Sequence, residues 1–215
     1  MMKLVCSAIA CCLLISTWGC APHLANYTVE LTKVNIVEGE PTARFSDVII
    51  GDSKMECENE LFSISWNLDW HGADLILENK TAKSMSIIWD QSVFIDPDGH
   101  CYGVIPSGIK YVDKDRFTKP TKIVGKKMVS KRILPSDFMT FHTERGWAEN
   151  AYLPKYSHGD LSSFSKMVSS YKGKEITVLL AIQYEGQVTE YSFVFEIIKS
   201  GVTKGNEGQV DGDLK

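Results

Sequence analysis

The chain has 215 residues, of which 44% are hydrophobic and 23% charged, an ordinary composition for a folded globular protein. Its formal net charge is −4 at pH 7, from 23 basic and 27 acidic residues. A general nucleic-acid binder carries a basic surface, which this balance argues against. We therefore expect no nucleic acid among its partners.

The first twenty residues have the layout of a secretory signal peptide. The short basic start Met1–Lys3 precedes the apolar run Leu4–Ile15, and small residues then lead to Cys20. This run is shorter than the roughly 20 apolar residues that a transmembrane helix needs. The segment therefore predicts export rather than a membrane span.

The end of this segment, Gly19-Cys20, resembles the lipobox of bacterial lipoprotein signals. The resemblance implies that residues 1–19 are a lipoprotein signal peptide and that Cys20 is the lipidated N-terminus of the mature protein. In Gram-negative lipoproteins an Asp after the cysteine favours the inner membrane. Ala21 stands here, so we expect a lipid-anchored protein at the outer membrane that faces the periplasm. Because Thr17 and Trp18 differ from the usual lipobox residues, a cleaved signal without lipid is the alternative.

The remaining 196 residues are enough for one sizeable domain or two small ones. We expect a tether over residues 20–27, a folded domain over 28–199 and a disordered tail over 200–215. The tail is rich in Gly, Asp, Asn and Glu and has no apolar period.

The cysteines predict one disulfide. Three of the six leave with the signal and Cys20 would carry the lipid, so only Cys57 and Cys101 remain in the folded domain. Two cysteines in an oxidising compartment are a natural pair. The alternative is two separate buried thiols.

Period-two patterning predicts a fold built mainly of strands. Apolar and polar residues alternate over residues 62–70, as expected for a strand with one buried face. Asp96-Pro97-Asp98-Gly99 predicts a turn, since Pro presets φ and Gly accepts positive φ. The other predicted strands are Ala73–Glu78, Met85–Trp89, Val93–Ile95, Cys101–Ile105 and a hairpin of residues 176–184 and 191–197 around Glu185-Gly186-Gln187.

One segment predicts a helix. Apolar residues recur at three- and four-residue spacing from Leu161 to Tyr171, Asp160 is a suitable N-cap and Gly173 stands just past the end. Many short strands and one helix predict a mainly β fold, a single antiparallel immunoglobulin-like β-sandwich with one short helix.

Three short stretches, Leu75–Asn79, Ser86–Asp90 and Phe94–Gly99, are similar to a pattern in small bacterial lipoproteins of immunoglobulin-like fold. In those proteins a strand that ends in Asn pairs with a Trp-Asp strand and an Asp-Gly turn. Many of them have no assigned activity, so the resemblance implies a fold and a compartment.

The chain lacks the motifs of known catalytic and metal sites. The five histidines are scattered without ligand spacing, and there is no G-x-S-x-G and no phosphate loop. We therefore expect no catalytic residues, no metal and no cofactor. An envelope hydrolase remains an alternative.

Basic residues are concentrated in the segment Lys110–Arg132, where nine basic residues face two acidic ones. The segment has a net charge of +7, which leaves −12 for the rest of the chain after Gly19. Such asymmetry indicates a basic face for an anionic partner such as lipid head groups or an acidic surface polymer. A solvated edge strand is the alternative. The nine candidate binding residues are Lys110, Lys114, Arg116, Lys119, Lys122, Lys126, Lys127, Lys131 and Arg132.

The tryptophans divide into two groups. Trp66, Trp70 and Trp89 lie on apolar stripes and are expected in the core, with a carbohydrate-stacking platform as the alternative. Trp147 lies in a polar segment and is the expected exposed aromatic, on a loop over residues 135–154.

These features together predict a membrane-anchored envelope lipoprotein that acts as a binding or scaffolding module. The expected partner is an envelope protein or an anionic surface polymer, bound through the basic segment or the loop around Trp147. A secreted or periplasmic protease inhibitor that presents the loop over residues 135–154 is the alternative.

Overall fold

The structure is a computed structural model that describes residues 22–38, 49–50, 55–109, 117–144 and 146–204. The signal segment, Cys20 and the part of the predicted tail beyond Lys204 lie outside the described residues. The elements are β1 (His23–Glu38), β2 (Ile49–Ile50), β3 (Glu56–Glu58), β4 (Phe62–Leu68), β5 (Ala73–Asn79), β6 (Met85–Ile95), β7 (Cys101–Pro106), β8 (Thr121–Ile123), β9 (Met128–Pro135), the 3-10 helix η2 (Ser136–Phe138), β10 (Met139–His142), β11 (Gly146–Glu149), β12 (Tyr156–Ser157), α1 (Leu161–Ser169), β13 (Glu175–Tyr184) and β14 (Gln187–Lys204).

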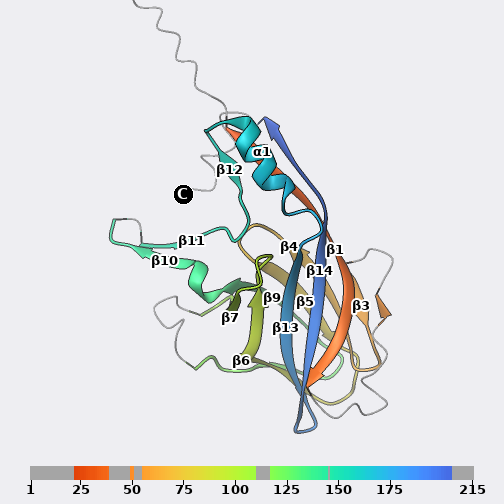
Figure 1. Ribbon diagram of the computed structural model, residues 1–215. Helices are drawn as coiled ribbons and strands as arrows, with labels where there is room; N and C mark the ends of the chain where they lie inside the picture. The colour runs from red at the N-terminus through yellow and green to blue at the C-terminus, as the bar shows by residue number, and fades with distance from the viewer. Residues whose placement is uncertain (1–21, 39–48, 51–54, 110–116, 145, 205–215) are drawn as a thin grey trace, which may run out of the picture.

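The strands form one antiparallel sheet that curls on itself, and a separate hairpin of β10 and β11 (Figure 1). The first half of the sheet has the strand order β12, β1, β14, β13, β6. The second half has the strand order β9, β5, β4, β3, β2. Strand β7 joins the halves, because its first residues pair with β6 and its last with β9. The mainly β, antiparallel fold with one α-helix is the predicted class.

Aromatic side chains from the two halves of the sheet meet in the core. The ring centroid of Trp66 on β4 lies 5.0 Å from that of Phe193 and 5.5 Å from that of Phe195, both on β14. Trp66 and Trp89 are buried, as predicted. Trp70 lies beyond the end of β4 and is only half-buried.

The domain extends further at both ends than the sequence predicts. Strand β1 begins at His23, within the expected tether, and β14 continues to Lys204, within the expected tail. The two ends pair with each other, with Leu24 opposite Thr203. This ladder is made of backbone hydrogen bonds, which need no apolar period in the sequence.

The predicted hairpin and helix are confirmed. Glu185 and Gly186 link β13 to β14 with φ of 51° and 85°, and two successive positive values are typical of a tight type I′ hairpin turn. Helix α1 begins after Asp160, whose carboxylate accepts a hydrogen bond from the backbone N–H of Ser163.

The molecule has two ends, named here for later use. The α1 end holds the start of β1, the end of β14, β12 and the start of α1, because His23 pairs with both Lys204 and Ser157. The turn end holds the β13–β14 turn, the β5–β6 loop and the β8–β9 turn, because Met85 pairs with both Tyr184 and Ile123. The 16 residues of β1 run from one end to the other, and a strand of this length spans at most about 50 Å at roughly 3.3 Å per residue.

At the turn end, the buried side chain of Asn79 joins two loops. Its amide donates to the carbonyl oxygens of Lys83 (2.7 Å) and Ile123 (3.1 Å), and its Oδ1 accepts from the backbone and the hydroxyl of Thr81 (2.9 and 2.8 Å). Gly125 of the β8–β9 turn lies so close that an added Cβ would be 2.3 Å from the carbonyl oxygen of Ala82. Only glycine fits there, so the two loops are locked together.

Candidate functional site

The structure distributes the predicted basic residues over several elements. Three of them, Lys110, Lys114 and Arg116, lie outside the described residues. Lys119 lies just before β8 and Lys122 lies on β8. Both side chains are exposed, at the edge of the first half of the sheet. The rest belong to the β8–β9 turn and to β9.

The exposed part of the basic segment is a turn at the turn end. Lys126 and Lys127 are both exposed in the β8–β9 turn, and Lys126 has a φ of 60°, which is unusual for a residue with a side chain. Its backbone N–H donates to the carbonyl oxygen of Thr81 and its ammonium to that of Lys80. These contacts hold the turn against the β5–β6 loop.

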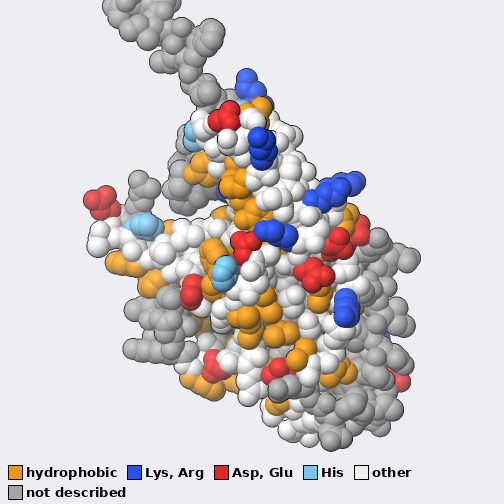
Figure 2. Space-filling model, in the orientation of Figure 1, with side chains coloured by type: hydrophobic (Ala, Val, Ile, Leu, Met, Phe, Trp, Pro, Cys, Tyr) orange, Lys and Arg blue, Asp and Glu red, His pale blue; other side chains and the backbone are white. Residues whose placement is uncertain are grey.

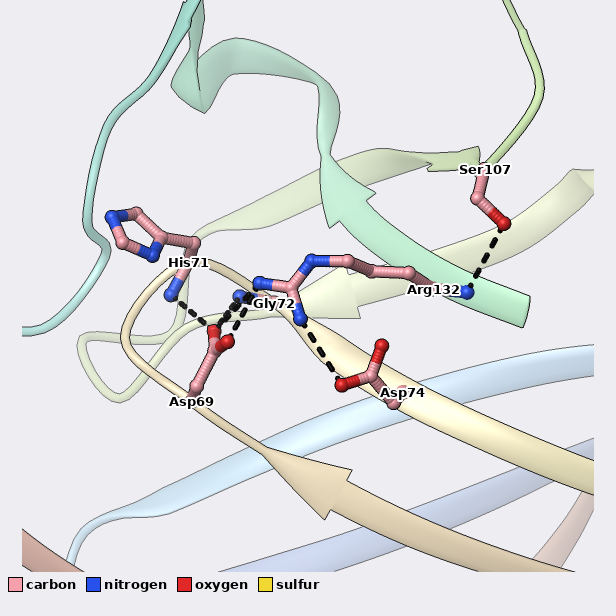
Figure 3. Close-up of polar contacts among 6 residues, drawn as sticks. All are labelled: Asp69, His71, Gly72, Asp74, Ser107 and Arg132. Carbon is pink, nitrogen blue, oxygen red and sulfur yellow. Dashed lines mark hydrogen bonds and ion pairs between the residues drawn. The ribbon is translucent and has the colours of Figure 1, made fainter. Parts of the chain in front are cut away.

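On β9 the basic side chains have partners within the fold. The ammonium of Lys131 donates to the carbonyl oxygen of Ser107 at 2.9 Å. Arg132 binds two carboxylates at once: its Nη2 lies 2.9 and 2.7 Å from the two oxygens of Asp69, and its Nη1 lies 3.2 Å from Oδ2 of Asp74 (Figure 3). Arg132 is therefore a fixed part of an ion-pair network and not a free cation.

The turn between β4 and β5 positions Asp69 in this network. The Asp69 carboxylate also accepts from the backbone N–H groups of His71 (2.8 Å) and Gly72 (3.0 Å). An added Cβ on Gly72 would lie 2.2 Å from the carbonyl oxygen of Ile133 on β9, so only glycine allows this turn to approach β9. The sequence Asp69–Gly72 thus folds as a turn that presents its carboxylate to Arg132.

The network perturbs the ionisation of its members. Burial opposes the charged form of Asp69, but hydrogen bonds from the His71 backbone and from Arg132 together hold its pKa below the ordinary value. Burial also lowers the pKa of His71, and nearby Lys155 and Arg132 act in the same direction. At neutral pH the network therefore contains charged Asp69 and Arg132 beside a neutral His71.

Beside this network lies a cavity of about 260 Å³ between β1 and the turn after β4. The segment 151–155 borders it and is called the strap. The backbone N–H of Tyr152 donates to the carbonyl oxygen of Trp70 (2.8 Å), and that of Ala25 on β1 donates to the carbonyl oxygen of Lys155 (2.9 Å). The strap thus bridges the two halves of the sheet. The residues that line this strap pocket are Asn26, Tyr27, Val29, Leu68, Asp69, Trp70, Tyr152 and Leu153.

Aromatic side chains hold the strap in place. The hydroxyl of Tyr27 donates to the carbonyl oxygen of Pro154 at 2.9 Å, and the Lys155 ammonium lies 5.0 Å from the ring centroid of Trp70. Tyr152 is 7% exposed, and its buried hydroxyl has no hydrogen-bond partner among the described residues. Burial and the nearby Asp69 carboxylate raise the pKa of Tyr152.

Two larger hollows are more open than the strap pocket. One, of about 420 Å³, lies between the strap and Tyr171. The other, of about 410 Å³, lies over β3, β4 and β5, where Ile76 and Met128 are exposed between Glu58 and Glu78. The strap pocket differs from both, because its aromatic walls adjoin a fixed network of charges.

Trp147 lies on β11 and is half-buried, so the expectation of an exposed tryptophan is wrong. It packs on a small cluster that includes Leu134 and Met139, and its ring centroid lies 5.4 Å from that of Phe141. Phe141 on β10 is the exposed ring, with 60% of its surface accessible. The expected loop is largely a β-hairpin that projects from the body of the domain (Figure 1).

The predicted disulfide is wrong in this structure, because Cys57 and Cys101 are both free. Cys57 on β3 is buried in the core, whereas Cys101 on β7 is exposed. In the strand order of the sheet, β9, β5 and β4 stand between β7 and β3. A disulfide requires Cα atoms within roughly 7 Å, and a count of cysteines carries no such information.

Within the described part of the chain, no three His, Cys, Asp or Glu side chains gather in a way that could hold a metal ion. None of the described helices is long and apolar enough to cross a membrane. Comparisons of the chain with protein-family models, curated proteins and solved structures found no match.

Proposed function

We propose that the chain is an exported envelope lipoprotein, anchored through Cys20, whose β-sandwich binds a small ligand in the strap pocket. The strap pocket carries the proposal for the sandwich. It combines three aromatic walls, Tyr27, Trp70 and Tyr152, with the polar residues Asn26 and Asp69. Apolar walls with a few fixed polar groups are typical of small-molecule sites.

The charges beside the pocket favour a neutral ligand. Asp69 and Asp74 are balanced by Arg132 and by Lys155 over the Trp70 ring, so neither an anion nor a cation finds a net opposite charge. The volume of about 260 Å³ lies below the roughly 300–1,000 Å³ of pockets for drug-sized ligands. A single neutral ring with hydroxyl groups and an apolar face, such as a pyranose sugar, fits both limits.

Ligand-observed NMR with N-acetylglucosamine and glucose tests the pocket. We expect saturation transfer to at least one sugar, and its loss in Asn26→Trp, which fills the pocket from an exposed position on β1. Trp70→Ala should also abolish it, whereas Trp147→Ala on the separate hairpin is the matched control. Circular dichroism checks that each variant is folded. Binding that survives both pocket variants, or no binding of either sugar, contradicts the proposed ligand site.

The anchor is tested separately. Expressed in a bacterium with its full signal, the chain should partition into the detergent phase, and Cys20→Ser should move it to the aqueous phase. Mass spectrometry of the purified protein should show acyl chains on the N-terminal cysteine. A Cys20→Ser variant that still partitions like the wild type defeats the anchor and leaves the pocket untouched.

One observation favours a second function, in which the β10–β11 hairpin is presented to a protein partner as in a protease inhibitor. The hairpin projects from the domain and carries Phe141, whose ring is 60% exposed. Inhibition assays against secreted serine and cysteine proteases test it, with Phe141→Ser as the disabling variant and Thr143→Ser as the control. If no protease is inhibited, this function is refuted.

A further inference from the structure

The folded domain begins only three residues after Cys20. Strand β1 starts at His23, and Pro22 before it is already buried. Three residues of fully extended chain span at most about 10 Å. A lipid on Cys20 would therefore hold the α1 end of the domain directly at the membrane surface, without the longer tether that the sequence predicts.

The α1 end brings together elements from distant parts of the chain. His23 lies between Lys204 and Ser157, and helix α1 packs onto Ala25 through Phe164 and Val168. Figure 1 shows α1, β12, the start of β1 and the end of β14 side by side at this end of the molecule. They form one continuous surface around the point where β1 begins.

This surface combines exposed apolar and basic side chains. Tyr156, Leu161 and Met167 are 42%, 49% and 44% exposed, which is high for large hydrophobic residues. Lysines are exposed on the same elements, and Figure 2 shows basic side chains beside apolar ones at this end, with an acidic side chain among them. An acidic residue, Asp160, also lies at the start of the helix, where its carboxylate accepts a hydrogen bond from the backbone N–H of Ser163. The exposed lysines of this surface are Lys204 at the end of β14, Lys166 on α1 and, further from the start of β1, Lys172 just after α1.

Such a combination suits the surface of a membrane with anionic lipids. Apolar and aromatic side chains enter the boundary between head groups and acyl chains, and lysines attract the anionic head groups. The short link to Cys20 also gives the membrane a high effective concentration at this end of the domain, which a free partner would lack.

We propose that the α1 end, through Tyr156, Leu161, Met167, Lys166, Lys172 and Lys204, docks onto the membrane that holds the lipid of Cys20. The proposal rests on the proposed lipid anchor. It orients the domain with β1 and β14 rising from the membrane. The β8–β9 turn with Lys126 and Lys127 then lies at the end of the domain away from the membrane, where a different partner can reach it.

An environment-sensitive fluorophore tests the docking on the full lipidated chain. In a Cys101→Ser background, which removes the exposed native thiol, one cysteine is introduced as Leu161→Cys and, in a second protein, as Glu185→Cys at the turn end. Each is labelled and reconstituted into vesicles of phosphatidylethanolamine and phosphatidylglycerol. We expect lipid-borne quenchers to quench the label at 161 about threefold more than the label at 185.

A charge variant and a lipid control separate the possible outcomes. A triple variant should remove the extra quenching of the label at 161; it combines Lys166→Glu, Lys172→Glu and Lys204→Glu. Vesicles of phosphatidylcholine in high salt should have the same effect on the unchanged chain. If the chain is lipidated and bound to vesicles but both labels are quenched equally, the docking is wrong and the anchor stands. If mass spectrometry shows no lipid on Cys20, the anchor is wrong and the docking falls with it.

Discussion

Replacement of Asn79 by Ala should destabilise the fold strongly, because this side chain joins two loops at the turn end. Asn79 is fully buried and makes four hydrogen bonds, of 2.7 to 3.1 Å. A hydrogen bond contributes about 1 kcal/mol net, and a buried group left without a partner costs about 1–3 kcal/mol. Thr81 and Lys83 lie on a partly exposed loop and can bond water instead, whereas Ile123 is buried.

These contributions sum to about 3 kcal/mol for Asn79→Ala, a large share of the roughly 5–15 kcal/mol by which domains are stable. For a domain of this size the melting temperature should fall by roughly 6–12 °C. Urea unfolding of the purified chain, followed by tryptophan fluorescence, gives the free energy. The matched control is Asn67→Ala on β4, where the side chain is exposed and the change should stay within about 0.5 kcal/mol.

Asn79→Asp separates the hydrogen bonds from packing, because Asp has nearly the same shape as Asn. The carboxylate still accepts from Thr81, but it faces the carbonyl oxygens of Lys83 and Ile123 without a proton to donate. Its pKa should be raised in the folded state, so stability should be lost as the pH rises above the ordinary carboxyl value. If Asn79→Ala is no more destabilising than Asn67→Ala, the joining role of this amide is refuted.

Three further predictions concern the thiols and the ion-pair network. A thiol reagent should modify Cys101 quickly in the native protein and Cys57 only after unfolding, since Cys57 is buried and burial raises its pKa to about 12. Fast modification of both cysteines in the native protein, or no further modification when the protein is unfolded, would contradict this. Arg132→Met should lower the free energy of unfolding in urea by about 1–3 kcal/mol, because it leaves the Asp69 carboxylate without its cation. A decrease no larger than that of the exposed control Lys122→Met would contradict the network. The free energy of unfolding should decrease as the pH falls below about 6.5, because the pKa of His71 is lowered in the folded state and the unfolded chain takes up the proton first. His71→Gln should make the free energy of unfolding depend less on pH in this range. An unchanged pH dependence would exclude His71 as its source.

The sequence predicted the strands well where burial follows a local period. In β4 the alternation from Phe62 to Trp66 appears directly as buried and partly buried positions. The tight turn at Glu185-Gly186 and the cap at Asp160 are equally local, because each depends on a few neighbouring residues. Such features are decided within a window of several residues and are therefore visible in a single sequence.

The ends of the domain were predicted poorly, because they depend on pairing between distant residues. His23 and Lys204 lie opposite each other in β1 and β14, and neither flank has an apolar period of its own. Each flank is ordered by the backbone of the other. The hairpin of β10 and β11 is similar: each of its strands has only four residues, and the pairing of Phe141 with Trp147 joins two strands too short to show a clear period.

The candidate site was only partly visible in the sequence. The sequence marks Arg132 as one of nine basic residues, but its partner Asp69 lies 63 residues away and nothing in the sequence joins the two. Trp70 was assigned to the core with Trp66, yet β4 ends between them and leaves Trp70 at the strap pocket. The role of Tyr152 has no sequence signal at all, since it depends on where the strap crosses between the halves of the sheet.

The strap pocket and the membrane docking together predict a dependence on ligand size. Asn26, which lines the pocket, is three residues beyond His23, so the nearer wall of the pocket lies within about 10 Å of the α1 end. In the docked orientation it lies close to the membrane surface. A monosaccharide should therefore reach it equally in the vesicle-anchored chain and in the soluble Cys20→Ser chain. A long polysaccharide of the same sugar should bind the anchored chain more weakly, because its flanking units meet the lipid surface. Equal binding of the polymer to both forms would place the pocket away from the membrane and contradict the docked orientation.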